Sequence, residues 1–327
     1  MERLLRNSRV LVTGGAGFIG SNLTESLLEA GNEVVCLDNF STGKRENIKS
    51  FLSDPNYNLI EGDIRNYDDC VNAVSGIDFV FHEAALGSVP RSIKDPVSST
   101  DVNIGGFVKI LFASKEAGVK RFIYAASSST YGDHPDLPKV EDKIGSPLSP
   151  YAITKYVDEL FADNFAKTYG IEVIGLRYFN VFGRRQDPDG AYAAVIPKFV
   201  KTMMKHERPR INGDGSVSRD FTYIDNVIQV NHLSALVEDK EALNQVYNVA
   251  HGERTSLNQL FYMIREKASN LDKNIIALEP EYGPFREGDI PHSLASIEKA
   301  RNMLGYLPTH NVEKGLDVAV EWYWNNL

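Results

Sequence analysis

The glycine-rich stretch TGGAGFIG at residues 13–20 constrains the fold of this 327-residue chain more than any other feature. It follows a β-branched run at residues 9–12 and precedes the pattern SNLTESLLEAG, which predicts a helix that ends at Gly31. Bare backbone between a strand and a helix lets a pyrophosphate approach the helix N-terminus, where unpaired N–H groups favour anions. The stretch therefore predicts a dinucleotide site around Gly14, Gly17 and Gly20.

An acidic residue in the next strand indicates which dinucleotide is bound. The strand expected at residues 33–37 ends in Asp38, eighteen residues beyond Gly20. An acid at this position accepts from the adenosine ribose hydroxyls and repels a 2′-phosphate, so it favours NAD over NADP. Lys44 and Arg45 argue against this preference for NAD, because basic residues just beyond the acid could accommodate the 2′-phosphate of NADP. Asp63, after a strand at 58–61, is well placed for the adenine but is equally explained as the N-cap of the next helix.

Predicted strands alternate with helical patterns through the first half of the chain. Further strands are expected at 78–82, 122–126 and 172–178, and a helix at 99–117 ended by Gly118. This alternation is typical of the α/β class with a doubly wound parallel (Rossmann) sheet. The pattern breaks after Gly183, which indicates a smaller C-terminal α+β substrate domain. We expect an NAD-binding domain over 1–183 plus about 219–251, with VYNVA returning to the sheet, and a substrate domain over about 184–218 plus 252–327.

Polar residues after the strand at 122–126 form a second constellation. Ser127, Ser128 and Ser129 lie where that strand should end, and Tyr151 and Lys155 lie four residues apart on a predicted helix. Positions four apart share a helix face, so the ammonium of Lys155 can favour the phenolate form of Tyr151, which then serves as a general base. The spacing alone is a weak signal. The helix is also expected to bury an apolar stripe at 153, 157, 160, 161 and 165.

Composition excludes several other classes of protein. The chain is 43% hydrophobic and 24% charged with a net charge of −9, which gives no indication of a nucleic acid or an anionic membrane as partner. No apolar run is long enough to cross a bilayer, and the N-terminus lacks the apolar segment of a signal peptide. Cys36 and Cys70 have no metal-ligand spacing and are too few for a disulfide framework. A reducing cytoplasmic setting and no metal site are expected.

Several motifs in order resemble the extended short-chain dehydrogenase/reductase superfamily. These are TGGAGFIG at 13–20, Asp38-Asn39, Gly62-Asp63-Ile64, HEAA at 82–85, SSSTYG at 127–132 and Tyr151-x-x-x-Lys155. The stretches LRYFNVFG at 176–183 and SRDFTYIDN at 218–226 are similar to nucleotide-sugar members. The resemblance covers essentially the whole chain and is strongest to the NAD-dependent UDP-hexose 4-epimerases.

This resemblance implies roles for individual residues. As a phenolate, Tyr151 would take the proton of the sugar 4-hydroxyl, Ser127 would hydrogen-bond the same oxygen, and Lys155 would hold the nicotinamide ribose. The implied cofactor-binding residues are Gly14, Gly17, Phe18, Ile19, Gly20, Asp38, Asn39, Ser41, Gly43, Asp63, Ile64, Ala84, Ala85, Asn103, Tyr151, Lys155 and Tyr178. The implied substrate-binding residues are Gly87, Ser88, Ser127, Ser128, Tyr151, Asn180, Ala194, Val195, Asn212, Arg219, Arg286 and Ser293. By analogy, the helix of Tyr151 and the helix at 99–117 pair across a homodimer.

Departures within the family narrow the expected reaction. Related dehydratases use an Asp-Glu pair where this chain has Ser128 and Ser129, so dehydration is not expected. Decarboxylases generally carry a Glu in this region, which is missing here. Asn180 favours a hexose over a uronate. Ser293, seven residues beyond Arg286, is small where members restricted to UDP-glucose have Tyr, and this leaves room for an N-acetyl group.

The resemblance therefore predicts interconversion of UDP-N-acetylglucosamine and UDP-N-acetylgalactosamine, with UDP-glucose and UDP-galactose as further substrates. One alternative is a 4-epimerase of UDP-N-acetylhexosaminuronate for surface polysaccharide synthesis, which would need a cation such as Arg91, Arg184 or Arg185 near the sugar carboxylate. Another is an inert NAD(H)-sensing regulator, against which the combination of Ser127, Tyr151 and Lys155 argues. For Arg219, a surface ion pair with Asp220 is the simpler explanation by spacing alone.

Overall fold

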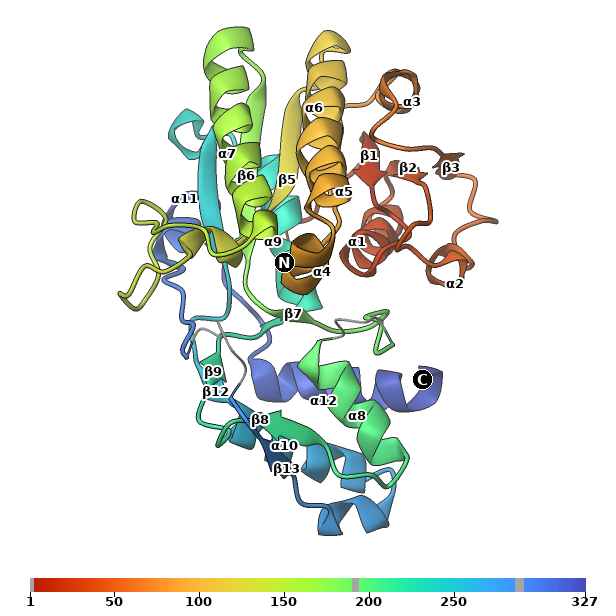
Figure 1. Ribbon diagram of the computed structural model, residues 1–327. Coiled ribbons are helices and arrows are strands. Elements are labelled where there is room, and N and C mark those ends of the chain that lie inside the picture. The colour runs from red at the N-terminus through yellow and green to blue at the C-terminus, as the bar shows by residue number, and fades with distance from the viewer. Residues whose placement is uncertain (1–2, 190–193, 286–290) are drawn as a thin grey trace.

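A computed structural model describes residues 3–189, 194–285 and 291–327 of the chain. Figure 1 shows a large sheet with its helices in the upper part and helices α8, α10 and α12 in the lower part. Of the predicted site residues, Arg286 lies outside the described residues.

A seven-stranded parallel sheet forms the centre of the upper part. Its strand order is β11-β6-β5-β4-β1-β2-β3, so the order reverses between β1 and β4. The strands are β1 Arg9–Thr13, β2 Glu33–Asp38, β3 Tyr57–Glu61, β4 Phe79–His82, β5 Arg121–Ser127, β6 Glu172–Tyr178 and β11 Gln245–Val249. The predicted doubly wound parallel sheet is confirmed, including the return of VYNVA, because β11 pairs in parallel with β6. Ligands of such sheets bind at the carboxyl ends of the strands near the reversal point.

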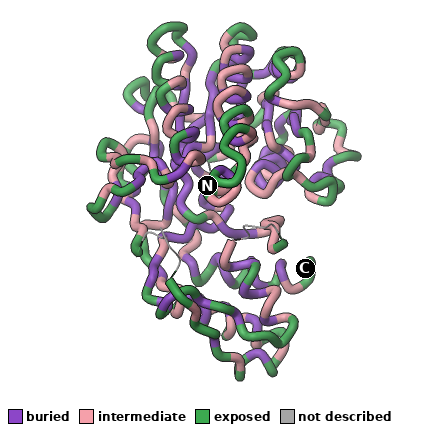
Figure 2. The backbone as a smooth tube through the Cα atoms, viewed as in Figure 1, coloured by how far each residue is buried: buried purple, intermediate pink, exposed green. Residues whose placement is uncertain are grey.

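Alternate side chains of the strands fill two cores, one on each face of the sheet. On β1, Val10 and Val12 belong to one core and Leu11 to the other, as a period of two requires. Figure 2 shows the strands buried and the helices with one exposed side. The helical segments of this part are α1 Phe18–Glu29, α2 Arg45–Ile48, α3 Tyr67–Ala73, α4 Val89–Lys94, α5 Pro96–Thr100, η1 Asp101–Gly106, α6 Phe107–Glu116, η2 Ser128–Tyr131, α7 Pro150–Tyr169, α9 Ile224–Leu236 and η3 Lys240–Ala242.

The helix expected at 99–117 consists of three segments. A π-helical turn, η1, separates α5 from α6. Asn103 is buried in this turn, accepts from the backbone of Leu86 at 2.8 Å and donates to Thr154 on α7 at 3.0 Å. Such turns are often found at functional sites, and this one places a polar side chain between α7 and the segment that follows β4.

Helix α7 presents a different face to the core than its apolar residues predicted. It begins where Ser149 caps the backbone of Ala152. Of the predicted buried stripe only Phe165 is buried, whereas Ile153 and Leu160 are 49% and 51% exposed. The buried positions include Lys155, Asp158 and Glu159. The prediction was wrong because Lys155 and Glu159 find partners on the sheet, and Ile153 and Leu160 are left on the outer surface.

The lower part contains short strand pairs and three longer helices. β8 pairs with β13 and β9 with β12. The remaining elements of the chain, among them α11 beside the sheet, are β7 Val181–Phe182, α8 Val195–Met204, β8 Arg210–Asn212, β9 Ser218–Arg219, β10 Thr222–Tyr223, β12 Thr255–Ser256, α10 Leu257–Ser269, η4 Lys273–Ala277, β13 Glu281–Gly283, α11 Glu298–Leu304 and α12 Val312–Asn326.

The domain boundaries given above stay a prediction. Within the described ranges, no helix has the length and apolar character needed to span a membrane.

Candidate active site

A cavity of about 330 Å³ lies at the carboxyl ends of β1, β2 and β4. The glycine-rich loop forms one wall. Gly14 has φ +68°, and a Cβ added there would lie 2.8 Å from the backbone of Ala84. Helix α1 starts beside this loop, and its N-cap Gly17 has no side chain to occupy the first N–H groups. The loop and the helix N-terminus therefore fit a pyrophosphate, as the sequence predicted.

Asp38 forms the opposite end of the same cavity. Its carboxylate accepts from the backbone N–H groups of Ala16 at 2.9 Å and of Phe40 at 2.8 Å. Burial raises the pKa of Asp38, and Gly43 packs so closely that a Cβ there would lie 2.9 Å from Oδ1. Each carboxylate oxygen keeps a second lone pair, so both can still accept from ribose hydroxyls.

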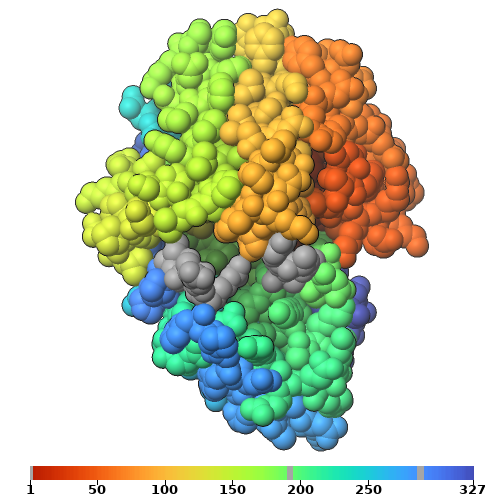
Figure 3. All heavy atoms as spheres, viewed as in Figure 1, coloured from red at the N-terminus to blue at the C-terminus, as the bar shows by residue number. Residues whose placement is uncertain are grey.

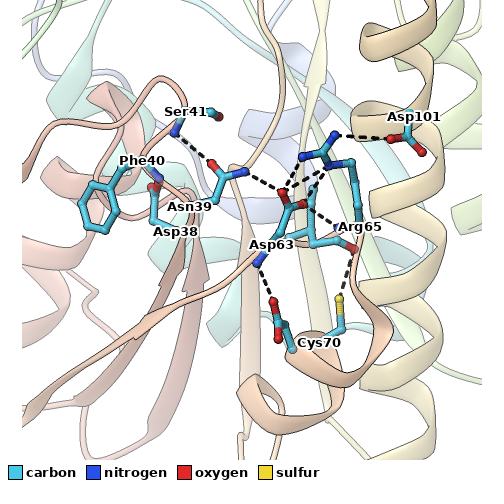
Figure 4. Close-up of polar contacts among 10 residues, drawn as sticks. Asp38, Asn39, Phe40, Ser41, Asp63, Arg65, Cys70 and Asp101 are labelled. Carbon is cyan, nitrogen blue, oxygen red and sulfur yellow. Dashed lines mark hydrogen bonds and ion pairs between the residues drawn. The ribbon is translucent and has the colours of Figure 1, made fainter.

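Asn39 and Asp63 form the side of the cavity next to Asp38. The amide of Asn39 donates to Asp63 at 2.8 Å (Figure 4). A hydrogen bond from Arg65 lowers the pKa of Asp63, so its carboxylate stays ionised. The explanation of Asp63 as a helix N-cap is wrong, because α3 is capped by Asn66, whose side chain accepts from the backbone of Asp68.

The two basic residues that opposed NAD both have acidic partners. Lys44 lies 3.0 Å from Asp187, and Arg45 makes a two-point contact with Glu61 at 2.7 and 2.9 Å. The Arg45 guanidinium also stacks 4.2 Å above the ring of Phe40. Both cations are thus engaged in this structure, which strengthens the prediction that the cavity prefers NAD over NADP.

We expect Asp38→Asn to weaken NAD binding by about 10-fold to 100-fold, because a charged acceptor of ribose hydroxyls becomes a neutral one. Discrimination against NADP should fall at the same time. Fluorescence titration of cofactor-stripped protein with NADH and NADPH measures both effects. Arg45→Ala is the control, since its exposed pair with Glu61 contributes little, and it should leave the cofactor preference unchanged. An Asp38→Asn protein with unaltered NADH affinity would contradict the assigned role of Asp38.

Helix α7 places Tyr151 and Lys155 one turn apart near the end of β5. The backbone N–H of Tyr151 donates to Ser92 at 3.0 Å, which ties the start of the helix to α4. The buried Lys155 ammonium donates to the carbonyl of Ala125 at 2.9 Å and to Asp158 at 3.3 Å. Burial opposes its charge, but Asp158, Tyr151 and Glu83 outweigh burial and raise the pKa of Lys155. Lys155 therefore remains a cation that interacts with Tyr151.

Ser127 is the last residue of β5 and is nearly buried. Its Oγ accepts from the backbone of Ser129 at 3.2 Å and from the Ser129 hydroxyl at 2.9 Å. Because both contacts use lone pairs, the Ser127 O–H remains available to donate to a substrate oxygen. The sequence prediction that a strand-end serine supplies such a donor is compatible with this geometry.

A second cavity, of about 510 Å³, adjoins the start of α7. Four predicted substrate residues line it, namely Ser128, Asn180, Arg219 and Ser293. The space-filling view shows the surface hollowed between helices α4 to α7 and the lower part of the chain (Figure 3). Arg219 donates to the backbone carbonyls of Ser218 at 2.9 Å and Pro291 at 3.3 Å. The neighbouring Asp220 accepts from the backbone N–H groups of residues 251, 252 and 295.

Other predicted substrate residues lie elsewhere. Gly87 lines the dinucleotide cavity, and Ser88 caps α4 by accepting from the backbone of Arg91. Ala194 and Val195 form the N-terminus of α8, and Asn212 is exposed at the end of β8. None of these residues is among those that line the 510 Å³ cavity. Their substrate contacts remain predictions.

Sequence reasoning missed three buried or lining groups. Glu83 lines the dinucleotide cavity and accepts from the hydroxyl of Tyr178 at 2.8 Å, and burial raises the pKa of Glu83 to about 7. Lys139 lines the substrate cavity, and Asp158 contacts Lys155. For Asp158 a signal existed, since it lies three residues after Lys155 on the same helix. His82 hydrogen-bonds Thr13 at 2.8 Å at the end of β4, so its ring has a structural partner.

A cavity that fits a dinucleotide and a second cavity beside the start of α7 are the features expected of a nicotinamide-dependent enzyme. Residues 10–250 match the model of the NAD dependent epimerase/dehydratase family. A putative UDP-glucose 4-epimerase from Methanocaldococcus jannaschii is 36% identical over 97% of this chain and 99% of its own. A UDP-glucuronate 4-epimerase from Thermodesulfobacterium geofontis is 32% identical over 97% and 96%.

Solved structures give the same result. The UDP-N-acetylglucosamine 4-epimerase of Methanobrevibacter ruminantium M1, in complex with UDP-N-acetylmuramic acid, superposes with a TM-score of 0.92 and 37% identity over 99% of this chain and 100% of that one. This chain therefore belongs to the NAD dependent epimerase/dehydratase family, within the extended short-chain dehydrogenases/reductases. NAD is its cofactor, and the glycine loop, the α1 N-terminus and Asp38 fit it.

Proposed function

We propose that this protein is a UDP-sugar 4-epimerase that interconverts UDP-N-acetylglucosamine and UDP-N-acetylgalactosamine and also accepts UDP-glucose and UDP-galactose. The observation that supports it most is the pair Tyr151 and Lys155 one turn apart on α7, whose start adjoins a cavity lined by Ser128, Asn180 and Ser293. Ser127 ends β5, and a separate cavity at the strand ends fits a dinucleotide. Among the compared relatives, 4-epimerases of three different UDP-sugars are similar to this chain, so the type of reaction is better supported than the sugar.

The chain's own residues account for the proton chemistry of this reaction. The Tyr151 phenolate, favoured by the neighbouring Lys155 ammonium, removes the proton from the sugar 4-hydroxyl. Ser127 donates a hydrogen bond to the same oxygen and orients it. When bound, NAD would supply reversible hydride transfer at C4, to either face of the sugar. Tyr151 then returns its proton to the C4 oxygen, so the enzyme ends each cycle in its starting state.

Residues at the substrate cavity argue for epimerisation and against elimination of water. Ser128 and Ser129 line this cavity where an acid and a base would be required for dehydration. Hydroxyl side chains cannot take those roles near neutral pH. Ser293 lines the cavity as well, and its small side chain leaves space for a 2-acetamido group.

The structure weakens the uronate alternative. Arg185 pairs with Glu25 on α1 at 2.6 Å, and Arg184 approaches Glu25 and Asp225 at 3.5 and 3.6 Å. Neither arginine lines the substrate cavity. Two of the three cations that could have held a sugar carboxylate are therefore committed to other partners.

Product analysis tests the proposed function directly. The purified protein is incubated separately with UDP-N-acetylglucosamine, UDP-glucose and UDP-N-acetylglucosaminuronate without added NAD, and the products are separated. Conversion of the first two substrates is expected. Conversion of only the uronate would overturn the assignment of the sugar, and inertness on all three would favour a regulator.

We also propose a homodimer built on the outer face of α7 and of the helical segment formed by α5, η1 and α6, which corresponds to the helix expected at 99–117. Val97, Ile153 and Leu160 are 77%, 49% and 51% exposed there, and α5 packs against α7. A cluster of exposed aliphatic side chains on adjacent helices is typical of a contact surface.

Leu160→Glu should convert the dimer to monomers, because a buried charge at the interface would be unpaired. Sedimentation velocity measures the change. Leu52→Glu introduces the same charge at a residue that is 58% exposed elsewhere, and it should leave the dimer intact. A Leu160→Glu protein that still sediments as a dimer would exclude this face.

A further inference from the structure

A buried carboxyl group lies directly behind the catalytic lysine. Asp158 follows Lys155 by three residues on α7, and neither side chain is more than 3% exposed. Its Oδ2 lies 3.3 Å from Lys155 Nζ, and its Oδ1 has no hydrogen-bond partner among the described residues. Charges that are shielded from water interact strongly, so the ionisation of Asp158 must influence Lys155.

The groups around this pair leave Lys155 as the counter-ion of Asp158. The adjacent Glu159 is neutralised by Arg177 through contacts of 2.7 and 2.9 Å. Burial lowers the pKa of His82 to about 3, so that ring is uncharged near neutral pH. The titratable groups that interact with Lys155 or Asp158 are His82 at the end of β4, Glu83 just after it, Tyr124 from β5, and Tyr151 and Glu159 from α7. Arg177 from β6 is engaged by Glu159.

We infer that Asp158 is a positioning residue that acts through Lys155, by holding the ammonium against β5 and by offsetting part of its charge. The inference rests on the proposed function, in which Lys155 favours the phenolate of Tyr151. Along α7 the order is Tyr151, Lys155 and Asp158, so the phenol that the ammonium favours and the carboxylate that opposes it lie on the same helix face, one turn to either side of Lys155. Two of the three ammonium N–H groups are used by Ala125 and Asp158.

The charge of Asp158 changes within the pH range in which the enzyme is expected to work. Burial raises the pKa of Asp158 to about 7 against the opposing effect of Lys155. When Asp158 is ionised, the net positive potential at Tyr151 is smaller, and the phenolate form that serves as base is favoured less. Asp158 thereby sets the lower pH limit of activity without contacting the substrate.

Asp158→Asn tests this inference because it removes the charge and keeps the shape. We expect the acid limb of the kcat/KM profile for the preferred UDP-sugar to move to lower pH by about one unit. Phenolate formation can also be followed without turnover, as the ultraviolet difference between each protein and its own Tyr151→Phe counterpart. This signal should appear at correspondingly lower pH in the Asp158→Asn protein.

Three further variants make the test specific. Asp158→Ser is a second neutral variant and should shift the limb in the same direction, whereas Asp158→Glu retains the charge and should keep the limb near that of the wild type. Asp163→Asn is the matched control on the same helix. Asp163 is 53% exposed and paired with Lys167 at 2.6 Å, so its substitution should leave both the acid limb and the phenolate signal unchanged.

The possible outcomes separate this inference from the proposed function. Neutral Asp158 variants with the wild-type acid limb and phenolate signal, whatever their maximal rate, would overturn the electrostatic role of Asp158. A wild-type protein that is inert on every UDP-sugar would overturn the proposed function. In that case the phenolate difference spectrum, which needs no substrate, would still show whether Asp158 has its electrostatic role.

Discussion

Replacement of Tyr151 by phenylalanine is expected to lower kcat for 4-epimerisation by about 10²-fold to 10⁴-fold, the contribution typical of a general base. The substitution keeps the aromatic ring and the helix start, where the backbone N–H of Tyr151 donates to Ser92. Only the hydroxyl that exchanges a proton with the sugar is lost. Steady-state rates with UDP-N-acetylglucosamine and UDP-glucose measure the effect, and NADH titration verifies that cofactor binding is retained.

Tyr156→Phe is the matched control for this experiment. Tyr156 lies on the same helix and is only partly buried, but it is outside the group formed by Ser127, Tyr151 and Lys155. Its substitution should leave kcat within about twofold of the wild type. Full activity in the Tyr151→Phe protein would show that another group is the base.

Ser293→Tyr is expected to suppress turnover of UDP-N-acetylglucosamine selectively and to spare UDP-glucose. The backbone N–H of Ser293 donates to the carbonyl of Ser218 at 3.1 Å, and the neighbouring His292 contacts the Ser218 hydroxyl at 2.9 Å. These contacts hold the backbone in place, so a larger side chain must enter the cavity. A ring that occupies the space of an acetamido group should lower kcat/KM for the acetylated sugar by about 10-fold to 200-fold.

Ser293→Ala separates the size of the side chain from its hydroxyl. Alanine is as small as serine, so the preference for acetylated over plain sugars should persist in this variant. The ratio of kcat/KM values for the two substrates is the quantity to compare. Equal losses on both substrates in the Ser293→Tyr protein would mean that position 293 does not select the sugar.

Local sequence signals predicted the sheet and the cofactor cavity well. The run TGGAGFIG combines glycine spacing, a preceding strand and a following helix, so the local sequence pattern is enough to predict its strand–turn–helix structure. The same holds for Asp38 and Ser127, which end the strands β2 and β5. Because strand ends of a parallel sheet meet at one edge, a prediction of strands also predicts which polar residues come together.

Local sequence signals could not predict contacts between distant segments. The pairing of Lys44 with Asp187 joins residues far apart in the sequence, and Arg184 and Arg185 find Glu25 on α1. For α7, the apolar residues predicted the wrong buried face. Glu159 is buried because it pairs with Arg177, and the helical pattern of the sequence does not reveal this partner. Charged side chains follow their partners, so periodicity alone misplaces a helix that carries buried ion pairs.

The late position of β11 in the sequence has a consequence for how the protein folds. Strand β6 pairs on one side with β5 but on the other only with β11, which follows about 70 residues later. Until residues 245–249 leave the ribosome, β6 is an unpaired edge that carries Val173, Ile174 and Leu176. Unpaired edges form hydrogen bonds with strands of other molecules, so a chain that stops before Gln245 should aggregate rather than form a shortened sheet. Completion of the sheet is a long-range, late event, and the segment that forms α8 has been synthesised before that event takes place.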